Sequence, residues 1–299
     1  MIRRHADARP PSFRRVCRPL LWTLLLGAMG CSSLASFERR MVYQPGTIEA
    51  PPEARAPVEE IVATTSDGLE LRGWLVRAPG GPQSSGSRRL ALFFHGNGGD
   101  RTGRMSEAAA FATAGCDTLL TDYRGYGGNP GTPSEAGLQK DAQAWWAAAL
   151  DAGYRPRSIA VVGNSLGGGV AVGLAADLCE SGESPGGLIV RSTFDSLTET
   201  AAHHQPLLPV RWLMTDRFDS AAVADRITCP ILQTHGTEDQ VVPLARGERL
   251  HAAFPDESAG GVPKQWIAVD GAGHNDLRRV ADGTWGVPER AFLQRLLVD

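Results

Sequence analysis

The chain has 299 residues, of which 42% are hydrophobic and 21% are charged, a composition typical of a globular protein large enough for one α/β domain. The formal net charge is −3, but residues 1–30 contain six arginines and one aspartate, so the rest of the chain has a net charge of −8. An acidic body without a cluster of lysines or arginines argues against nucleic-acid binding, and the lack of an internal repeat argues against a solenoid or propeller.

The first 30 residues resemble a bacterial secretory signal peptide. Their arginines precede the apolar segment 20–28, which has the length of a signal-peptide core and is too short for a typical transmembrane helix. Cys31 follows Ala28-Met29-Gly30, which resembles a bacterial lipobox, although a lipobox usually has leucine in place of Ala28. We therefore expect a membrane-anchored lipoprotein of the bacterial cell envelope, lipidated on Cys31, with Ser32 allowing sorting to the outer membrane. An uncleaved membrane anchor is the alternative.

Residues 31–57 contain four prolines and are predicted to tether the lipidated cysteine to one folded domain, residues 58–299. Strands are expected at residues 58–65, 69–77, 90–94, 116–121, 159–163, 187–190, 230–234 and 265–269, and helices near residues 102–114, 134–152, 166–180, 219–226, 243–253 and 287–298. The first two strands flank a hairpin signal, Ser66-Asp67-Gly68. The later strands are continuous apolar runs, as in a parallel sheet covered on both faces. The predicted fold class is α/β, a doubly wound, mostly parallel sheet of about eight strands with helices on both faces.

The segment 194–218 interrupts the alternation of strands and helices. Its apolar stretch, residues 206–214, is interpreted either as a small lid over a hydrophobic pocket or as a loop and helix packed on the core. His203 and His204 are adjacent, so their side chains diverge, and they lack the partner spacing of a metal site.

Three cysteines remain when the leader and its lipobox cysteine are set aside. They are Cys116, Cys179 and Cys229. An odd number without Cys-x-x-Cys spacing indicates neither a disulfide scaffold nor a zinc site. We expect Cys116 and Cys229 to be small buried residues at the starts of strands.

The sequence Gly163-Asn164-Ser165-Leu166-Gly167 lies between a predicted buried strand and a predicted helix of small residues. A Gly-x-Ser-x-Gly motif in this context is typical of a nucleophile elbow, a tight turn that presents a serine hydroxyl above the sheet. A second match, around Ser184, lies between a helix and a strand, and Pro185 has no N–H to offer an oxyanion. Ser165 is therefore the candidate nucleophile; a structural serine in a glycine-rich turn is the alternative.

A serine nucleophile needs a base that accepts its proton and a carboxylate that orients the base. His274 is the favoured base because it follows the last predicted strand, where it can reach the elbow. The other downstream histidines are His235 and His251. Asp239, in the loop after the penultimate strand, is the favoured carboxylate. The alternatives to it are Glu238 and Asp195.

An oxyanion hole needs two N–H donors aimed at the developing negative charge. The N–H of Leu166, directly after the candidate nucleophile, is one candidate. The other is the N–H of Asn97, in the loop His95-Gly96-Asn97-Gly98-Gly99 that follows a predicted strand. A phosphate-binding loop is disfavoured because the Walker lysine is absent from this sequence.

Taken together, these motifs resemble the α/β-hydrolase superfamily, most closely its serine aminopeptidase-like and monoacylglycerol-lipase-like branch. The motifs are Phe94-His95-Gly96-Asn97-Gly98-Gly99, Asp122-Tyr123-Arg124-Gly125-Tyr126-Gly127, the elbow, His235-Gly236-Thr237-Glu238-Asp239-Gln240-Val241-Val242-Pro243, and Gly271-Ala272-Gly273-His274. The resemblance covers residues 58–299 in the order of the family. It implies that Ser165, Asp239 and His274 form a catalytic triad, with Asn97 and Leu166 as oxyanion donors.

The resulting functional prediction is a serine hydrolase that cleaves carboxylic esters of a small-molecule acyl substrate through an acyl-enzyme intermediate. No metal or organic cofactor is expected, and the membrane is expected as a partner through the lipid anchor. The resemblance does not fix the substrate, because members of the superfamily cleave esters, thioesters and amides. A peptidase or amidase of the same fold, or a non-catalytic binding protein of the envelope, are the alternatives.

Overall fold

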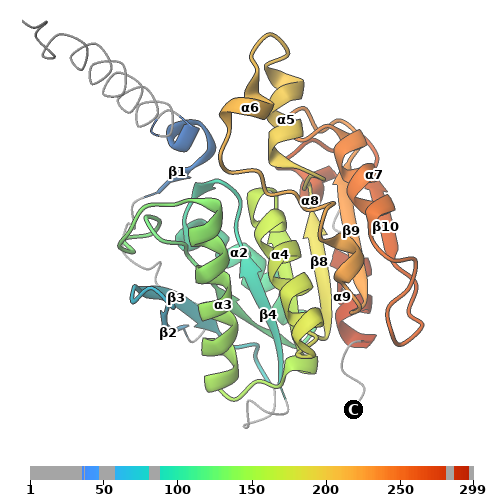
Figure 1. The fold of residues 1–299 in the computed structure, drawn as a ribbon. Coiled ribbons are helices and arrows are strands. Elements are labelled where there is room, and N and C mark those ends of the chain that lie inside the picture. The colour runs from blue at the N-terminus through green and yellow to red at the C-terminus, as the bar shows by residue number, and fades with distance from the viewer. Residues whose placement is uncertain (1–35, 37, 47–57, 81–87, 281–285, 296–299) are drawn as a thin grey trace, which may run out of the picture. The chain divides into compact units, whose positions relative to one another are not determined.

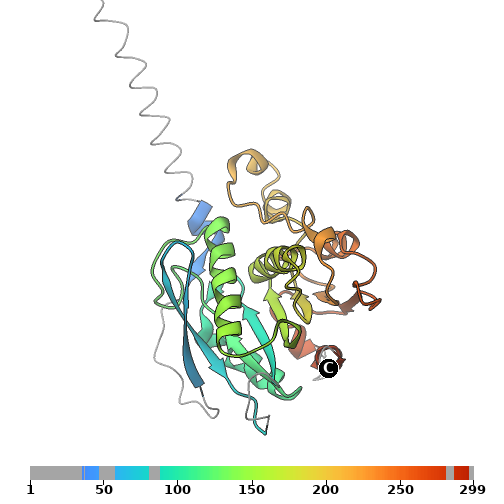
Figure 2. The same ribbon diagram turned by 60° about the horizontal axis from the view of Figure 1, so that its bottom comes forward.

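A computed structural model describes residues 36, 38–46, 58–80, 88–280 and 286–295 (Figures 1 and 2). The predicted signal peptide, Cys31 and most of the predicted tether lie outside the described residues. The chain divides into two compact units, Met1–Met41 and Val42–Asp299, and the second contains the sheet described below. Within the described part, no helix combines the length and apolar character that a membrane span requires.

One eight-stranded sheet organises the second unit (Figure 1). In spatial order, its strands are β2 (Val58–Thr64), β3 (Glu70–Val76), β6 (Cys116–Leu120), β4 (Arg89–Phe94), β7 (Ile159–Asn164), β8 (Gly187–Arg191), β9 (Ile231–Gly236) and β10 (Gln265–Val269). Strand β3 is antiparallel to both of its neighbours, and every other adjacent pair is parallel. This sheet confirms the predicted fold class and the predicted hairpin. A short parallel pair, β1 (Gln44–Pro45) and β5 (Gly98–Gly99), forms a separate two-stranded ladder.

Helices cover both faces of the sheet. The α-helices are α2 (Met105–Ala112), α3 (Glu135–Asp151), α4 (Leu166–Ser181), α5 (Leu197–His204), α6 (Val210–Leu213), α7 (Leu244–Ala253), α8 (Leu277–Val280) and α9 (Gly286–Arg295). Buried side chains of α3, α4 and α7 join the core on one face, and those of α2 and α9 join the core on the other. Because the two faces are both covered, the central strands β4, β7 and β8 are buried along most of their length, and each contains the continuous apolar run that the sequence indicated.

The helix expected near residues 219–226 was a wrong prediction. Only Ala224–Arg226 is helical, as the single 3₁₀ turn η4. The backbone N–H of Ala221 donates to the Asp195 carbonyl at 2.9 Å, and Phe218 has a left-handed φ of 39°. These tertiary and backbone constraints replace the helical hydrogen bonds that the local sequence pattern would support.

The segment 194–218 contains the two short helices α5 and α6. Helix α5 begins at the N-cap Ser196, whose hydroxyl accepts a hydrogen bond from the Glu199 N–H. The three cysteines of the described part are free thiols. Cys116 and Cys229 are buried, which confirms the expectation for these two.

Candidate active site

Ser165 occupies the tight turn between β7 and α4. Its backbone has φ 53° and ψ −119°, a conformation that is strained for a residue with a side chain. A Cβ atom on Gly163 would lie 2.2 Å from the Gly167 carbonyl oxygen, and a Cβ on Gly167 would lie 2.2 Å from the Phe94 carbonyl oxygen. Both flanking glycines are therefore required for the close contact of strand and helix, and the turn has the geometry of a nucleophile elbow.

The structure brings Ser165, His274 and Asp239 into one hydrogen-bonded series. The His274 Nε2 lies 2.9 Å from the Ser165 Oγ, and its Nδ1 lies 2.7 Å from the Asp239 Oδ2. A carboxylate only accepts hydrogen bonds, so the His274 proton lies on Nδ1 and Nε2 is free to accept the serine proton. The three side chains come from loops that follow β7, β9 and β10, at the carboxyl edge of the sheet.

Backbone donors hold the Asp239 carboxylate in place. Its Oδ1 accepts hydrogen bonds from the N–H groups of Val241 and Val242, at 2.9 and 2.8 Å. The carboxylate is buried, and its Oδ2 also lies 3.4 Å from the His235 Nε2. Burial lowers the pKa of His235, and the ring donates its Nε2–H to the Val242 carbonyl at 2.8 Å. His235 therefore packs behind the carboxylate as a neutral side chain and does not contact Ser165.

The loops that carry Asp239 and His274 are hydrogen-bonded to one another. The Thr237 N–H donates to the Val269 carbonyl at 3.0 Å, and the Glu238 N–H donates to the Ala272 carbonyl at 2.9 Å. A Cβ on Gly236 would lie 2.2 Å from the Ala272 carbonyl oxygen, so only glycine permits this approach. The distance between the histidine and its carboxylate is therefore set by the backbone.

The alternative residues occupy other places. The Asp195 carboxylate forms an ion pair with Arg246 at 3.1 Å, and Glu238 is exposed. Ser184 lies between α4 and β8 and contacts the Thr228 hydroxyl at 3.4 Å. His251 is half-buried on α7, against Trp266 at a ring distance of 5.3 Å. None of these contacts brings an alternative residue to the elbow.

The two proposed oxyanion donors flank the serine. Leu166 is the first residue of α4, where backbone N–H groups have no acceptor within the helix. Gly96 precedes Asn97, and a Cβ on Gly96 would lie 3.4 Å from the Ser165 Cβ, so this loop lies directly against the elbow. The carbonyl oxygen of Asn97 accepts hydrogen bonds from the Tyr126 hydroxyl and the Gln44 N–H, both at 2.9 Å.

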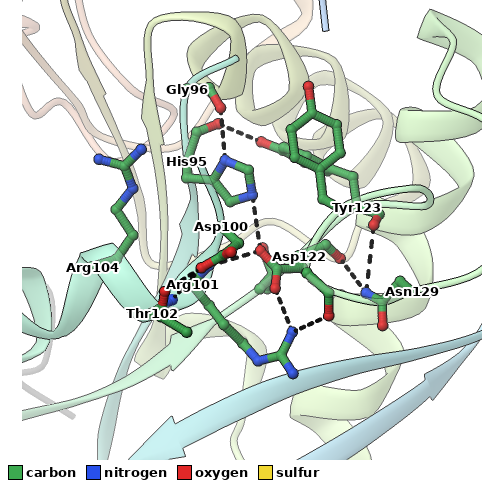
Figure 3. Close-up of polar contacts among 12 residues, drawn as sticks. His95, Gly96, Asp100, Arg101, Thr102, Arg104, Asp122, Tyr123 and Asn129 are labelled. Carbon is green, nitrogen blue, oxygen red and sulfur yellow. Dashed lines mark hydrogen bonds and ion pairs between the residues drawn. The ribbon is translucent and has the colours of Figure 1, made fainter. Parts of the chain in front are cut away.

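A buried polar network behind this loop was not assigned a role from the sequence (Figure 3). His95 and Asp122 are fully buried, and the His95 Nε2 lies 3.0 Å from the Asp122 Oδ1. Arg101 donates its backbone N–H to the same carboxylate at 2.9 Å, and its guanidinium pairs with the other carboxylate oxygen. The signal in the sequence was the joint presence of the His95-Gly96 and Asp122-Tyr123 motifs. Both motifs were used only as part of the family resemblance, and no contact between them was predicted.

Comparisons with known proteins identify the family to which this fold belongs. A family model described as the alpha/beta hydrolase fold matches residues 92–185. An uncharacterised protein of Mycobacterium tuberculosis (strain CDC 1551 / Oshkosh) is 39% identical over 269 residues, covering 87% of this chain and 89% of that protein. This chain belongs to the α/β-hydrolase superfamily. The Pyrococcus furiosus esterase shares the fold of this hydrolase, with a TM-score of 0.68 at 18% identity over 86% of this chain and 98% of the esterase.

A lipase is also among the relatives of this α/β hydrolase. The lysophosphatidylserine lipase ABHD12 of Danio rerio is 32% identical over 200 residues, which are 60% of this chain and 51% of the lipase. This chain therefore spans about half the length of that relative.

Proposed function

We propose that this α/β hydrolase is a serine esterase that cleaves carboxylic esters through an acyl-enzyme intermediate. The observation that carries the proposal is the hydrogen-bonded series from Asp239 through His274 to Ser165, with contacts of 2.7 and 2.9 Å. A serine hydroxyl alone is a weak nucleophile, and a base at hydrogen-bonding distance is what activates it. The left-handed backbone of Ser165 supports the same proposal, because a strained turn persists where it holds a reactive group.

In this mechanism, the Ser165 Oγ attacks the acyl carbonyl carbon while its proton passes to the His274 Nε2. Asp239 holds the imidazole in the required tautomer and stabilises the imidazolium that forms. The carbonyl oxygen becomes an oxyanion and accepts hydrogen bonds from the Asn97 and Leu166 N–H groups. The imidazolium then protonates the departing alcohol, and water, deprotonated by His274, releases the acid from Ser165.

An exposed apolar surface on the α5–α6 segment supports a lipid-like ester as the substrate. This segment contacts the loop that carries Asp239, since the His204 Nε2 lies 2.8 Å from the Val241 carbonyl oxygen. On the α5–α6 segment, 96% of Leu207, 88% of Trp212 and 53% of Leu208 are accessible to solvent. Segment 205–214 contains no carboxylate. Large apolar side chains exposed together are typical of a surface that meets lipid or a partner. The similarity to a lysophosphatidylserine lipase points to the same class of substrate.

Attachment to a membrane is also proposed, from the sequence alone. The arginines, the apolar segment 20–28 and the cysteine at position 31 together predict a lipidated envelope protein. Its test is metabolic labelling with a radioactive or alkyne fatty acid. We expect wild type to be labelled and Cys31→Ser to be unlabelled; labelling of both would contradict lipidation at this residue.

A substrate panel tests the proposed activity. Purified protein is assayed with p-nitrophenyl esters of increasing acyl length and with aminoacyl p-nitroanilides, and Ser165→Ala is assayed in parallel. We expect hydrolysis of the esters, increasing with acyl length, and loss of this activity in Ser165→Ala. Faster hydrolysis of the anilides would favour the peptidase or amidase alternative, and equal activity in Ser165→Ala would contradict the role of the serine.

A further inference from the structure

The loop that lies against Ser165 is anchored through its carbonyl groups. From residue 95 to residue 99, each of the five consecutive carbonyl oxygens accepts a hydrogen bond, from four donors outside the loop and from the ring of His95 within it. The donors, in chain order, are the Tyr123 hydroxyl at 2.7 Å, the His95 Nδ1 at 2.6 Å, the Tyr126 hydroxyl at 2.9 Å, the Arg104 guanidinium at 2.7 Å and the Gly46 N–H at 2.9 Å. The orientation of every peptide in the loop is therefore fixed from behind.

One of these anchors acts on the peptide that supplies the proposed oxyanion donor. The Gly96 carbonyl and the Asn97 N–H belong to the same peptide unit. In a trans peptide these two groups point in opposite directions. A donor that binds the Gly96 oxygen from behind therefore directs the Asn97 N–H towards the elbow and increases its polarity, since hydrogen bonds in a chain strengthen one another.

The contact of His95 with the loop requires a proton on its Nδ1. This nitrogen faces the Gly96 carbonyl oxygen at 2.6 Å, and a carbonyl oxygen only accepts. The other ring nitrogen, Nε2, lies 3.0 Å from the Asp122 Oδ1 (Figure 3). Asp122 in turn accepts a hydrogen bond from the Arg101 N–H and pairs with the Arg101 guanidinium. Asp122 therefore fixes the position of the ring that donates to the loop.

We propose that His95 and Asp122 are positioning residues of the oxyanion hole. Asp122 fixes the position of the His95 ring, and His95 donates from Nδ1 to the Gly96 carbonyl and so orients and polarises the Asn97 N–H. The inference rests on the proposed esterase function, since it concerns the same site.

Substitution of His95 by asparagine or by glutamine keeps one of its two contacts and removes the other. The Asn amide nitrogen can take the place of the His95 Nδ1, so His95→Asn keeps a neutral donor to the Gly96 carbonyl. The Gln amide nitrogen takes the place of Nε2, so His95→Gln keeps the contact with Asp122 and loses the donor. Loss of a whole oxyanion donor lowers kcat by about 10²–10³-fold. A donor that stays but is misdirected has a smaller effect, so we expect His95→Gln to lower kcat about 10–100-fold without changing KM.

The matched controls separate this role from a general loss of folding. His95→Asn should keep kcat within about 5-fold of wild type, and His251→Gln, the same change at a histidine that packs on Trp266, should keep wild-type kcat and KM. Equal losses in His95→Asn and His95→Gln, or unchanged kcat in His95→Gln, would overturn the proposal.

A measurement on the unmodified protein covers the case in which a variant fails to fold. In ¹⁵N-histidine-labelled wild type near neutral pH, the His95 ring should carry a proton on Nδ1, assigned by contacts with the Tyr123 and Tyr126 rings at 4.6 and 5.3 Å. A ring without a proton on Nδ1 would overturn the proposal. Labelling of wild-type Ser165 by a fluorophosphonate is scored separately, so failure of the esterase function is distinguishable from failure of this inference.

Discussion

Replacing Asp239 with asparagine tests how the carboxylate controls His274. The substitution keeps the shape of the side chain and leaves one oxygen to accept from the Val241 and Val242 N–H groups, now at 2.9 and 2.8 Å. The amide NH₂ then faces His274 where the Oδ2 lies 2.7 Å from Nδ1. Because NH₂ is a donor, the ring accepts it on Nδ1 and carries its own proton on Nε2. In that tautomer, the nitrogen next to Ser165 cannot take the serine proton.

The expected loss follows from this change of tautomer. The equivalent substitution in a serine protease triad lowers kcat about 10⁴-fold, so we expect Asp239→Asn to lower kcat by about that factor, or about 5.5 kcal/mol of transition-state stabilisation. KM and the free energy of unfolding should change little, because both backbone hydrogen bonds of the side chain are kept. The assay is steady-state hydrolysis of p-nitrophenyl butyrate, together with urea denaturation of both proteins.

Asp195→Asn is the matched control, since this aspartate is also buried and also follows a strand but pairs with Arg246. It should keep kcat within about 3-fold of wild type. Our reasoning is refuted if Asp239→Asn retains more than about a tenth of the wild-type kcat, or if Asp195→Asn loses as much as Asp239→Asn does.

Three further outcomes are expected. Gly167→Ala should lower the free energy of unfolding by about 2–4 kcal/mol in urea, since its Cβ would lie 2.2 Å from the Phe94 carbonyl oxygen; unchanged stability would show that the turn can open. His235→Gln should reduce the loss of stability on acidification. Burial lowers the pKa of His235 from the ordinary 6.5, so the unfolded chain binds a proton at a higher pH than the folded chain does. The free energy of unfolding of the wild type therefore falls as the pH drops below 6.5, by up to about 1.4 kcal/mol per pH unit. An identical pH slope in the variant would contradict this. Leu207→Ser/Trp212→Ser should lower activity on micellar p-nitrophenyl palmitate at least about 5-fold and leave soluble p-nitrophenyl acetate unaffected; equal effects on both esters would argue against a lipid-facing role.

The fold class, the positions of the strands along the chain and the place of the site could be predicted from short segments. Continuous apolar runs marked the central strands β4, β7 and β8 to within one residue, because these strands are covered on both faces. Asp239 and His274 were found because loops after parallel strands meet at one edge. Their approach to 2.7 Å depends on Gly236, whose need for glycine appears only when the Ala272 carbonyl is seen beside it.

The remaining features depend on contacts between distant segments. The segment before η4 has a helical composition, but the Asp195 carbonyl takes the N–H of Ala221, so tertiary structure overrides local propensity. The His95 ring lies 3.0 Å from the Asp122 carboxyl group, a partner that no periodicity connects to it. Similarly, the sequence showed that residues 206–214 are apolar, and the structure was needed to show that Leu207 and Trp212 are exposed.

The central claim is that Ser165 is a nucleophile activated by His274, and covalent labelling tests it most directly. The folded protein is incubated with a fluorophosphonate, and the modified residue and the stoichiometry are determined by mass spectrometry of the intact chain and of its peptides. We predict one adduct per chain, located on Ser165, and no adduct in Ser165→Ala. An absence of labelling in folded wild type, or an adduct on another residue that persists in Ser165→Ala, would contradict the account.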